Sequence, residues 1–123
     1  MSFKSKASST SETNQEAAIT LDLLYEQAQD YIARHYNEKG LNASLIAESL
    51  GCSTRQLSRA FQGRPETLTV LIRRIRLMVG YNMLQQHPEL AVAEVARRLH
   101  FYDAKYFKRC YKKQFGHLPR QGS

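Results

Sequence analysis

The stretch from Leu68 to Gln86, LTVLIRRIRLMVGYNMLQQ, constrains the fold more than any other part of the chain. At 3.6 residues per turn it forms a helix with two apolar stripes on opposite sides. One stripe consists of Leu68, Ile72, Ile75, Val79 and Met83, and the other of Val70, Leu77, Tyr81 and Leu84. A surface helix carries one apolar stripe, whereas a helix with two is packed on both sides. The sequence therefore predicts a central helix between two small bundles, with one stripe against each bundle.

The positive charge of the chain is concentrated in its second part. The 123 residues carry a net charge of +7, and this length suits one domain or two small lobes. Residues 19–52 have a net charge of −3, whereas residues 53–123 combine fourteen Lys and Arg with four Asp and Glu, a net charge of +10. Such a distribution is typical of proteins that bind polyanions. The alternative is a basic surface that only keeps the protein soluble.

The composition argues against a membrane protein and against an enzyme. No run of about 18 apolar residues could span a membrane, and an apolar signal core is missing, so a cytoplasmic location is expected. Cys52 and Cys110 are isolated, and the four histidines match no metal spacing. Neither a Gly-rich phosphate loop nor a nucleophile motif occurs. We therefore predict no catalytic residue, no metal site and no cofactor.

A helix, a tight turn and a second helix are predicted before the central segment. Asn42 caps the first of these helices, Gly51-Cys52 forms the turn, and Ser53 caps a helix from Thr54 to Phe61. Two short helices joined in this way indicate a helix-turn-helix motif.

An amphipathic helix that Thr20 caps and Gly40 ends is predicted to precede this motif. Residues 1–18 are polar without an apolar period, so a flexible tail or a linker is expected there.

The same pattern returns after Pro88, which ends the central helix near Gln86. The predicted elements are a helix from Ala91 to Leu99, a turn at His100-Phe101-Tyr102, the cap Asp103, and a helix from Ala104 to about Phe115 that Gly116 ends. Each second-helix cap is followed at offsets four, six and eight by an apolar residue, an arginine and an aromatic residue. These are Leu57, Arg59 and Phe61 in the first copy, and Phe107, Arg109 and Tyr111 in the second. The period of about 50 residues indicates a duplicated structural unit.

With this repeat the sequence resembles the DNA-binding domain of AraC/XylS-family transcription regulators, over about Leu21 to Pro119. The matching segments are STRQLSRAF at residues 53–61, RIRL at residues 74–77 and FYDAKYFKRCYKK at residues 101–113, with Gly116 and Pro119. The chain departs from the family pattern at four places. His100 stands where the family usually has Gly, residues 63–68 lack the usual Gly-x-Ser/Thr-Pro, Leu118 replaces a usual Ser or Thr, and the Tyr-Arg after the proline is missing.

The resemblance implies an all-α fold of about seven helices, in which two helix-turn-helix lobes are joined by a long central helix. The expected boundaries are a tail or linker at 1–18, a first lobe at 19–66, the central helix at 67–87 and a second lobe at 88–123. The implied function is sequence-specific binding of double-stranded DNA by a bacterial transcription regulator. This domain is expected to be monomeric and to place two recognition helices in successive major-groove segments.

The resemblance further implies activation through contact with RNA polymerase, which the residues themselves do not show. The alternative function is a protein-interaction module whose basic face meets an acidic partner, with weak or lost DNA binding.

The outward residues of the two recognition helices are the expected base readers, because the major groove admits one helix at a time. By family position these residues are Arg55, Ser58 and Arg59 in the first lobe, and Ala104, Lys105, Lys108 and Arg109 in the second. The candidate phosphate contacts are Ser53, Thr54, Gln62, Arg73, Arg74, Lys112 and Lys113. Two roles stay open for Arg76, which either contacts phosphate or pairs with an acidic residue of the first lobe. Tyr102 and Tyr106 either meet the DNA backbone or pack in the core or at its rim.

Gly80 in the middle of the central helix costs roughly 1 kcal/mol relative to Ala. Either another helix approaches closely at this point or the glycine is merely tolerated.

Overall fold

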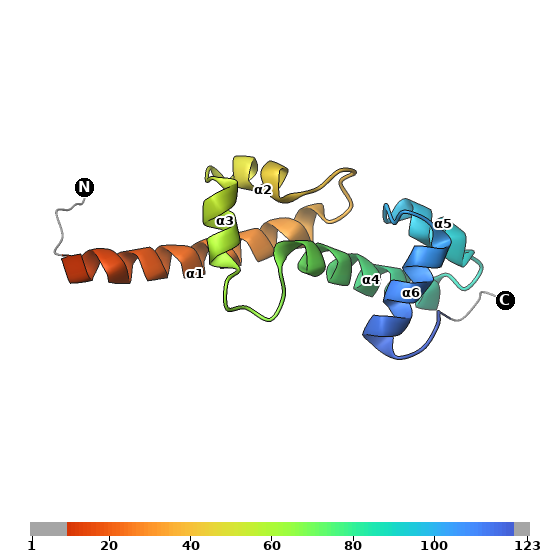
Figure 1. The fold of residues 1–123 in the computed structure, drawn as a ribbon. Helices are drawn as coiled ribbons and strands as arrows, with labels where there is room; N and C mark the ends of the chain where they lie inside the picture. The colour runs from red at the N-terminus through yellow and green to blue at the C-terminus, as the bar shows by residue number, and fades with distance from the viewer. Residues whose placement is uncertain (1–9, 120–123) are drawn as a thin grey trace.

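Six α-helices make up residues 10–119, the part of the chain that the computed structural model describes, and no strand occurs among these residues (Figure 1). In chain order the helices are α1 (Thr10–His35), α2 (Ala43–Leu50), α3 (Thr54–Ala60), α4 (Leu68–Gln86), α5 (Val92–Arg98) and α6 (Ala104–Phe115). The prediction of an all-α fold is confirmed, with six helices where about seven were expected. The central helix α4 has the bounds that its apolar pattern predicts.

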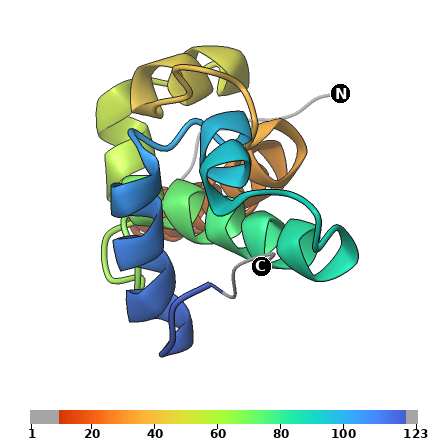
Figure 2. The ribbon, with the colours of Figure 1, turned by 90° about the vertical axis from the view of Figure 1, so that its right-hand side faces the viewer.

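Helix α4 joins two lobes. In Figure 1, α1 and α4 run along the long axis of the molecule, α2 and α3 lie beside the point where they meet, and α5 and α6 lie at the far end of α4. The first lobe therefore comprises α1, α2, α3 and the beginning of α4, and the second lobe comprises the end of α4 with α5 and α6. Figure 2, turned by 90°, shows that the α5–α6 unit stands against α4.

Each lobe has its own buried core. The core of the first lobe draws on four helices and is mostly aliphatic. Its buried members are Leu24, Ala28, Ile32, Leu41, Ile46, Ala47, Leu57, Ala60, Phe61, Leu68, Leu71 and Ile72. The core of the second lobe is smaller and contains two fully buried aromatic rings. Its buried members are Leu77, Leu84, Val92, Val95, Ala96, Leu99, Phe107 and Tyr111.

The two cores contact different parts of α4, which differ both in their position along the helix and in the side of the helix that they occupy. Leu68 is buried in the first core, whereas Leu77 and Leu84, from the opposite stripe, are buried in the second. The prediction that α4 packs on two sides is thus confirmed. The assignment of one whole stripe to each lobe is wrong, because Val79 and Met83, from the stripe of Leu68, pack against the second core. The reason is that the lobes contact successive halves of the helix.

Helix α1 begins earlier and ends earlier than predicted. It starts at Thr10, so residues 10–18, expected as part of a tail or linker, are helical, and Thr20 lies inside the helix. These residues lack Gly and Pro, and the Glu, Gln and Ala among them favour helix. The helix ends at His35, and Gly40 adopts φ +77° in the loop that follows. Residues 1–9, the rest of the predicted tail, lie outside the described part.

Side-chain caps start α3 and α6 at the predicted residues. The Ser53 hydroxyl oxygen accepts from the backbone N–H of Gln56 at 3.0 Å, and the Asp103 carboxylate accepts from that of Tyr106 at 2.7 Å. The backbone N–H of Ser53 also donates to the Gln56 side chain at 3.0 Å, which completes a capping box. These caps satisfy backbone donors that a helix N-terminus otherwise leaves without partners.

Gly80 lies where α4 meets both helices of the second lobe. A Cβ atom added to it would lie 3.0 Å from the Leu99 side chain and 3.1 Å from the Phe107 ring. The first of the two predicted explanations, close approach of another helix, is therefore confirmed. The absence of a side chain at Gly80 allows α5 and α6 to seat against α4, which fixes the position of the second lobe.

Candidate nucleic-acid interface

The second helices of the two helix-turn-helix units, α3 and α6, lie on the same face of the molecule. Both cross in front of the α1–α4 axis in Figure 1, and both lie on the left side in the perpendicular view of Figure 2. Helix α4 separates them, and its 19 residues extend for about 28 Å at 1.5 Å per residue. The molecule therefore presents two parallel ridges on one side.

Helix α3 divides cleanly into a buried and an exposed side. Leu57 and Ala60 are almost fully buried and anchor the helix on the core of the first lobe. Every predicted contact residue of this unit is exposed. These residues are Ser53, Thr54, Arg55, Ser58, Arg59 and Gln62. The 3.6-residue period thus places two arginines and several hydroxyl and amide groups on the outward side of α3.

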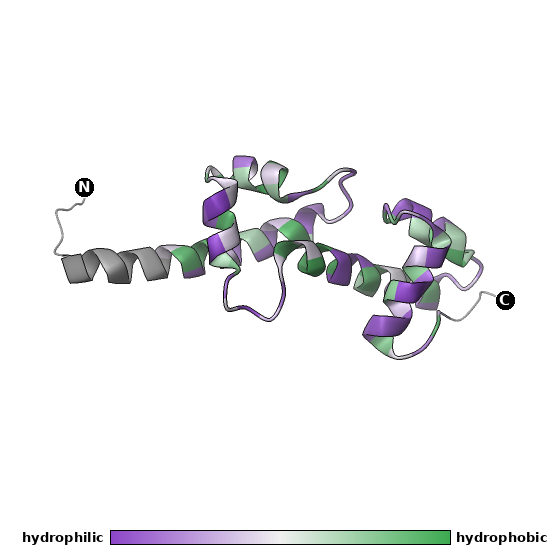
Figure 3. Cartoon of the chain, viewed as in Figure 1, coloured by the Kyte–Doolittle hydropathy of each residue, from purple (hydrophilic) through white to green (hydrophobic). Residues whose placement is uncertain are grey.

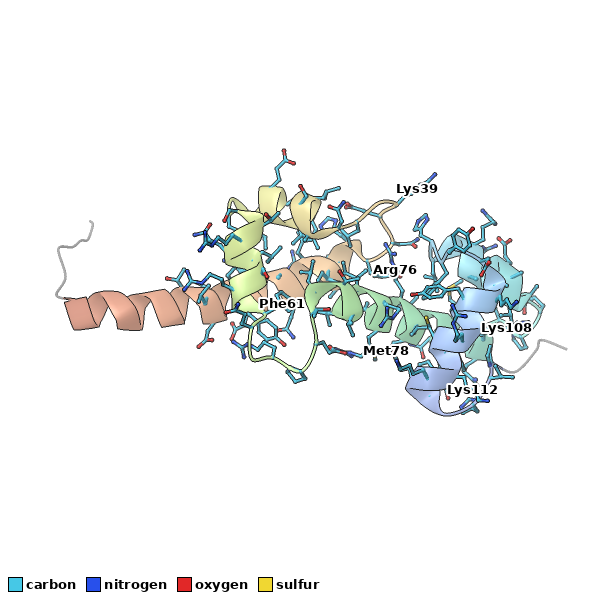
Figure 4. The ribbon with its side chains drawn as sticks, viewed as in Figure 1. Lys39, Phe61, Arg76, Met78, Lys108 and Lys112 are labelled. Atoms are coloured by element: carbon cyan, nitrogen blue, oxygen red, sulfur yellow. The ribbon has the colours of Figure 1, made fainter. Side chains whose placement is uncertain are left out.

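Helix α6 is longer and much more basic. Phe107 and Tyr111 are buried on its inner side, while hydrophilic bands follow its visible side in Figure 3. Of the predicted contact residues, four are exposed and two are half-buried. The exposed residues are Lys105, Arg109, Lys112 and Lys113, and the half-buried ones are Ala104 and Lys108. Figure 4 shows that Lys108 and Lys112 both come from α6.

Most of these cations are available for an external partner. Among the side chains that the structure describes, no hydrogen bond or ion pair engages Arg55, Arg59, Lys105, Lys112 or Lys113. The arginines of α5 differ in this respect. Arg97 and Arg98 both contact the Glu94 carboxylate, at 2.5 and 2.8 Å. The hydrogen bond from Arg97, followed in size of effect by that from Arg98, lowers the pKa of Glu94 to about 2. The unpaired positive charge is therefore concentrated on the two ridges.

Tyr106 connects α4 to the outward side of α6. The Arg73 guanidinium donates to the Tyr106 hydroxyl at 3.5 Å, and the Arg109 guanidinium lies 5.4 Å from the centre of the Tyr106 ring. The hydrogen bond is long and therefore weak, and the cation–π distance lies within the usual limit of about 6 Å. Sequence reasoning left Tyr106 between backbone contact and packing, and the structure places it half-buried between the two arginines.

Arg74, a predicted phosphate contact, already has a partner within the protein. Its Nε donates to the Glu66 carboxylate at 2.6 Å, and both side chains are partly buried. A phosphate contact by Arg74 thus requires that it leave or share this ion pair. Arg73, one residue earlier, has no acidic partner among the described side chains and is the more available of the two.

Arg76 has the structural role, although its partners are not the predicted ones. Its Nε donates to the carbonyl oxygen of Tyr36 at 2.7 Å, and its NH2 group donates to that of Glu38 at 3.0 Å. The prediction of an acidic side chain as partner is wrong, because the loop after α1 presents backbone carbonyls to the guanidinium. Burial lowers the pKa of Arg76. Figure 4 shows Arg76 between the two lobes.

The turns of the two helix-turn-helix units have the same left-handed backbone but different residues. Gly51 has φ +74°, and His100 has φ +64°. Glycine adopts this conformation without penalty, whereas a residue with a Cβ atom loses roughly 1–2 kcal/mol. His100 Nε2 lies 2.9 Å from the carbonyl oxygen of Asn37 in the first lobe. Sequence reasoning missed this contact, for which the histidine in place of the family's glycine was the available signal.

Tyr102, the other tyrosine with two open roles, is 90% exposed, so core packing is excluded for it. Within residues 10–119, no group of three or more His, Cys, Asp and Glu side chains could hold a metal ion. No helix in the same range is long and apolar enough to cross a membrane.

Residues 46–122 match the family model described as a helix-turn-helix domain. The transcriptional activator RhaS of Escherichia coli O139:H28 is 29% identical over 116 residues, which are 94% of this chain and 40% of that protein. RhaS of Escherichia coli K12 is 28% identical over the same length. The chain thus spans about two fifths of the length of these relatives.

Solved structures of similar fold cover 78% of the chain. The C-terminal domain of AraT, a response regulator from Geobacillus stearothermophilus, is 29% identical with a TM-score of 0.69, and 79% of it is covered. A probable AraC-family regulator from Rhodopseudomonas palustris, 90% covered, has a TM-score of 0.71 at 24% identity, a likeness of fold alone. Together with the double helix-turn-helix architecture, the match over more than half of the sequence shows that this chain belongs to the AraC/XylS family of transcription regulators.

Proposed function

We propose that this chain binds double-stranded DNA with sequence specificity as part of a bacterial transcription regulator. In this proposal α3 and α6 enter successive major-groove segments on one side of the duplex, so that a monomer covers a two-part site without a palindrome. The observation that carries the proposal is the pair of exposed helices on one face, both rich in unpaired cations.

The dimensions support this arrangement. The major groove returns to the same side of DNA about every 34 Å. Helix α4 extends about 28 Å, and the two lobes add their own width to the separation of α3 and α6. The length of α4 and the repeat of the major groove are therefore of the same scale.

The chemistry of the two ridges supports the division into base and phosphate contacts. The arginine fork matches the two acceptors of guanine, O6 and N7, and Ala104 offers a methyl group that suits a thymine methyl. We assign base contacts to Arg55, Ser58, Arg59, Ala104, Lys105, Lys108 and Arg109. The assigned phosphate contacts are Ser53, Thr54, Gln62, Arg73, Arg74, Lys112 and Lys113, with Arg74 shared between phosphate and Glu66.

The names of the RhaS relatives support a role in activation, since each is described as a transcriptional activator. By this analogy the proposal includes activation of transcription through contact with RNA polymerase. This chain matches about two fifths of the length of RhaS. That the whole regulator activates transcription is therefore part of the same proposal.

A salt titration of duplex binding tests the proposal. Neutralising about six to ten phosphates releases their counterions, so affinity should fall on the order of 10³-fold between 50 and 200 mM salt. Fluorescence anisotropy with a labelled duplex measures this slope, and a selected site should keep its advantage over random DNA at each salt concentration. A flat response, or no duplex binding at all, favours the alternative in which the basic face meets an acidic protein.

A further inference from the structure

Three consecutive carbonyl groups of the first lobe accept hydrogen bonds from residues that belong to α4 and the second lobe. Arg76 of α4 donates to the carbonyls of Tyr36 and Glu38, and His100 of the second helix-turn-helix turn lies 2.9 Å from that of Asn37. We call these five residues the interlobe clamp. The loop that carries the carbonyls connects α1 to α2, so the clamp joins both helix-turn-helix units.

Further contacts hold the loop in place. The His35 ring nitrogen Nδ1 lies 2.6 Å from the Glu38 carboxylate, and the Glu38 backbone N–H donates to the His35 carbonyl at 3.0 Å. The Tyr36 side chain packs against the core of the second lobe, although the residue follows directly after α1. The carbonyls are therefore presented by a held segment, and a shift of the second lobe must break their hydrogen bonds.

His100 makes its contact to Asn37 while its backbone has a conformation that favours glycine. Its φ is +64°, and no other residue with a side chain has a positive φ among residues 10–119. Gly51 occupies the corresponding turn of the first lobe, where an added Cβ atom would have no neighbour within 4 Å. A glycine at position 100 would relieve the backbone but could make no contact with Asn37, so the histidine provides the interlobe bond at the expense of local strain.

We propose that the interlobe clamp fixes the angle between α3 and α6, and that His100 thereby determines which half-site spacing the protein accepts. The proposal rests on the proposed function for its DNA-binding consequence, but the fixed angle is a property of the protein alone. In this role His100 and Arg76 are positioning residues, because neither has to touch a base.

The first test measures the interlobe angle without DNA. Spin labels at Ser44→Cys on α2 and Ala93→Cys on α5 occupy exposed positions of the two lobes, in a background with Cys52→Ala and Cys110→Ala. Double electron–electron resonance should give a narrow distribution of the distance between the two spin labels for the parent protein and a broader one for His100→Gly. Arg76→Lys, which keeps the charge but loses the two-pronged donor, should broaden it as well.

The control is His117→Gly, which removes a histidine whose described contacts lie within the second lobe, to the carbonyl of the next residue and to the Tyr111 ring. This variant should leave the distance distribution narrow. Thermal unfolding shows whether a broader distance distribution comes from a change of lobe orientation or from loss of folding. Because glycine relieves the strain at position 100, the second lobe of His100→Gly should remain folded. An unchanged distribution in folded His100→Gly overturns the proposal.

The second test measures half-site spacing on duplex DNA. For the parent protein, one extra base pair between the half-sites should lower affinity, and in His100→Gly this penalty should shrink by about threefold to tenfold, the factor that one hydrogen bond supplies. An undiminished penalty beside a broadened distance distribution overturns the role of His100 in spacing. If the parent protein binds no duplex, the proposed function fails, and the distance measurement still decides whether the clamp exists.

Discussion

The two lobes repeat one helix-turn-helix plan but stabilise and equip it differently. The first lobe surrounds a mostly aliphatic core with three helices and the beginning of α4, and its turn has glycine at the left-handed position. The second lobe has only α5 and α6 against the end of α4, and relies on Phe107 and Tyr111 together with the missing side chain at Gly80. The smaller lobe thus fills its core with larger rings and closer helix contact.

The outward sides of α3 and α6 also differ, in the polar and charged groups that they carry. Helix α3 presents two arginines among hydroxyl and amide groups, whereas α6 presents Lys105, Lys108, Arg109, Lys112 and Lys113. Hydrogen bonds to base edges discriminate sequence, whereas Lys112 and Lys113, the assigned phosphate contacts of α6, add attraction to any duplex. Under the proposed function we therefore expect the second lobe to supply more of the salt-dependent affinity.

The largest expected effect comes from emptying the equivalent core positions. Phe107→Ala should lower the free energy of unfolding by about 3–5 kcal/mol and Leu57→Ala by about 2–5 kcal/mol, because both side chains are almost fully buried. Amide hydrogen exchange should show faster opening mainly in the lobe that carries the substitution. Equal acceleration in both lobes would mean that the two cores are one cooperative unit.

Adding a side chain at Gly80 should have the next largest effect on the free energy of unfolding. Gly80→Val forces its side chain against Leu99 and Phe107 and should lower the free energy of unfolding by about 1–3 kcal/mol. The matched control is Asn82→Val, which places the same residue at an exposed position of α4. Denaturant unfolding measures both variants, and similar losses in the two would show that steric contact is not the cause.

Removal of the equivalent arginines tests the base contacts. Arg59→Ala and Arg109→Ala should each cost about 1–3 kcal/mol of binding free energy, confined to one half of the site. The control Lys113→Ala should weaken binding to all duplexes alike and reduce the salt slope by about 1. Competition between specific and random duplexes measures these differences. An equal loss on both kinds of DNA after Arg59→Ala would remove Arg59 from the base readers.

The helix caps provide the smallest expected effect. Ser53→Ala and Asp103→Ala each remove an acceptor for a backbone N–H, which should lower the free energy of unfolding by about 1 kcal/mol. Ser53 belongs to a capping box, and Asp103 adds a negative charge at the positive end of the α6 dipole. Urea unfolding measures both, and a loss beyond 3 kcal/mol at either cap would indicate a role in tertiary packing.

Much of this fold follows from local rules that the sequence displays. The bounds of α4, the caps Ser53 and Asp103 and the inward residues of α5 follow from apolar period and capping chemistry, which act over a few residues. The start of α1 could not be inferred in this way, because polar residues with good helix propensity leave no apolar period to detect.

The site was predictable to the extent that it is local. Which residues of α3 and α6 face outward follows from the repeat, and the predicted contact residues of these helices are exposed except for Ala104 and Lys108, which are half-buried. The carbonyl partners of Arg76 and His100 were not predictable, because they belong to a loop about 40 and 63 residues away in sequence. A backbone acceptor leaves no side-chain signature, so only the three-dimensional arrangement identifies it.

In the proposed complex, α4 holds the two recognition helices at a fixed separation on one side of the DNA. The most direct test of this arrangement compares duplexes selected from a random pool with the same duplexes carrying about five extra base pairs between the half-sites, which turns one half-site by about half a helical turn. Binding should then fall to the level of a duplex with a single intact half-site. Unchanged affinity for the lengthened duplex would contradict this arrangement.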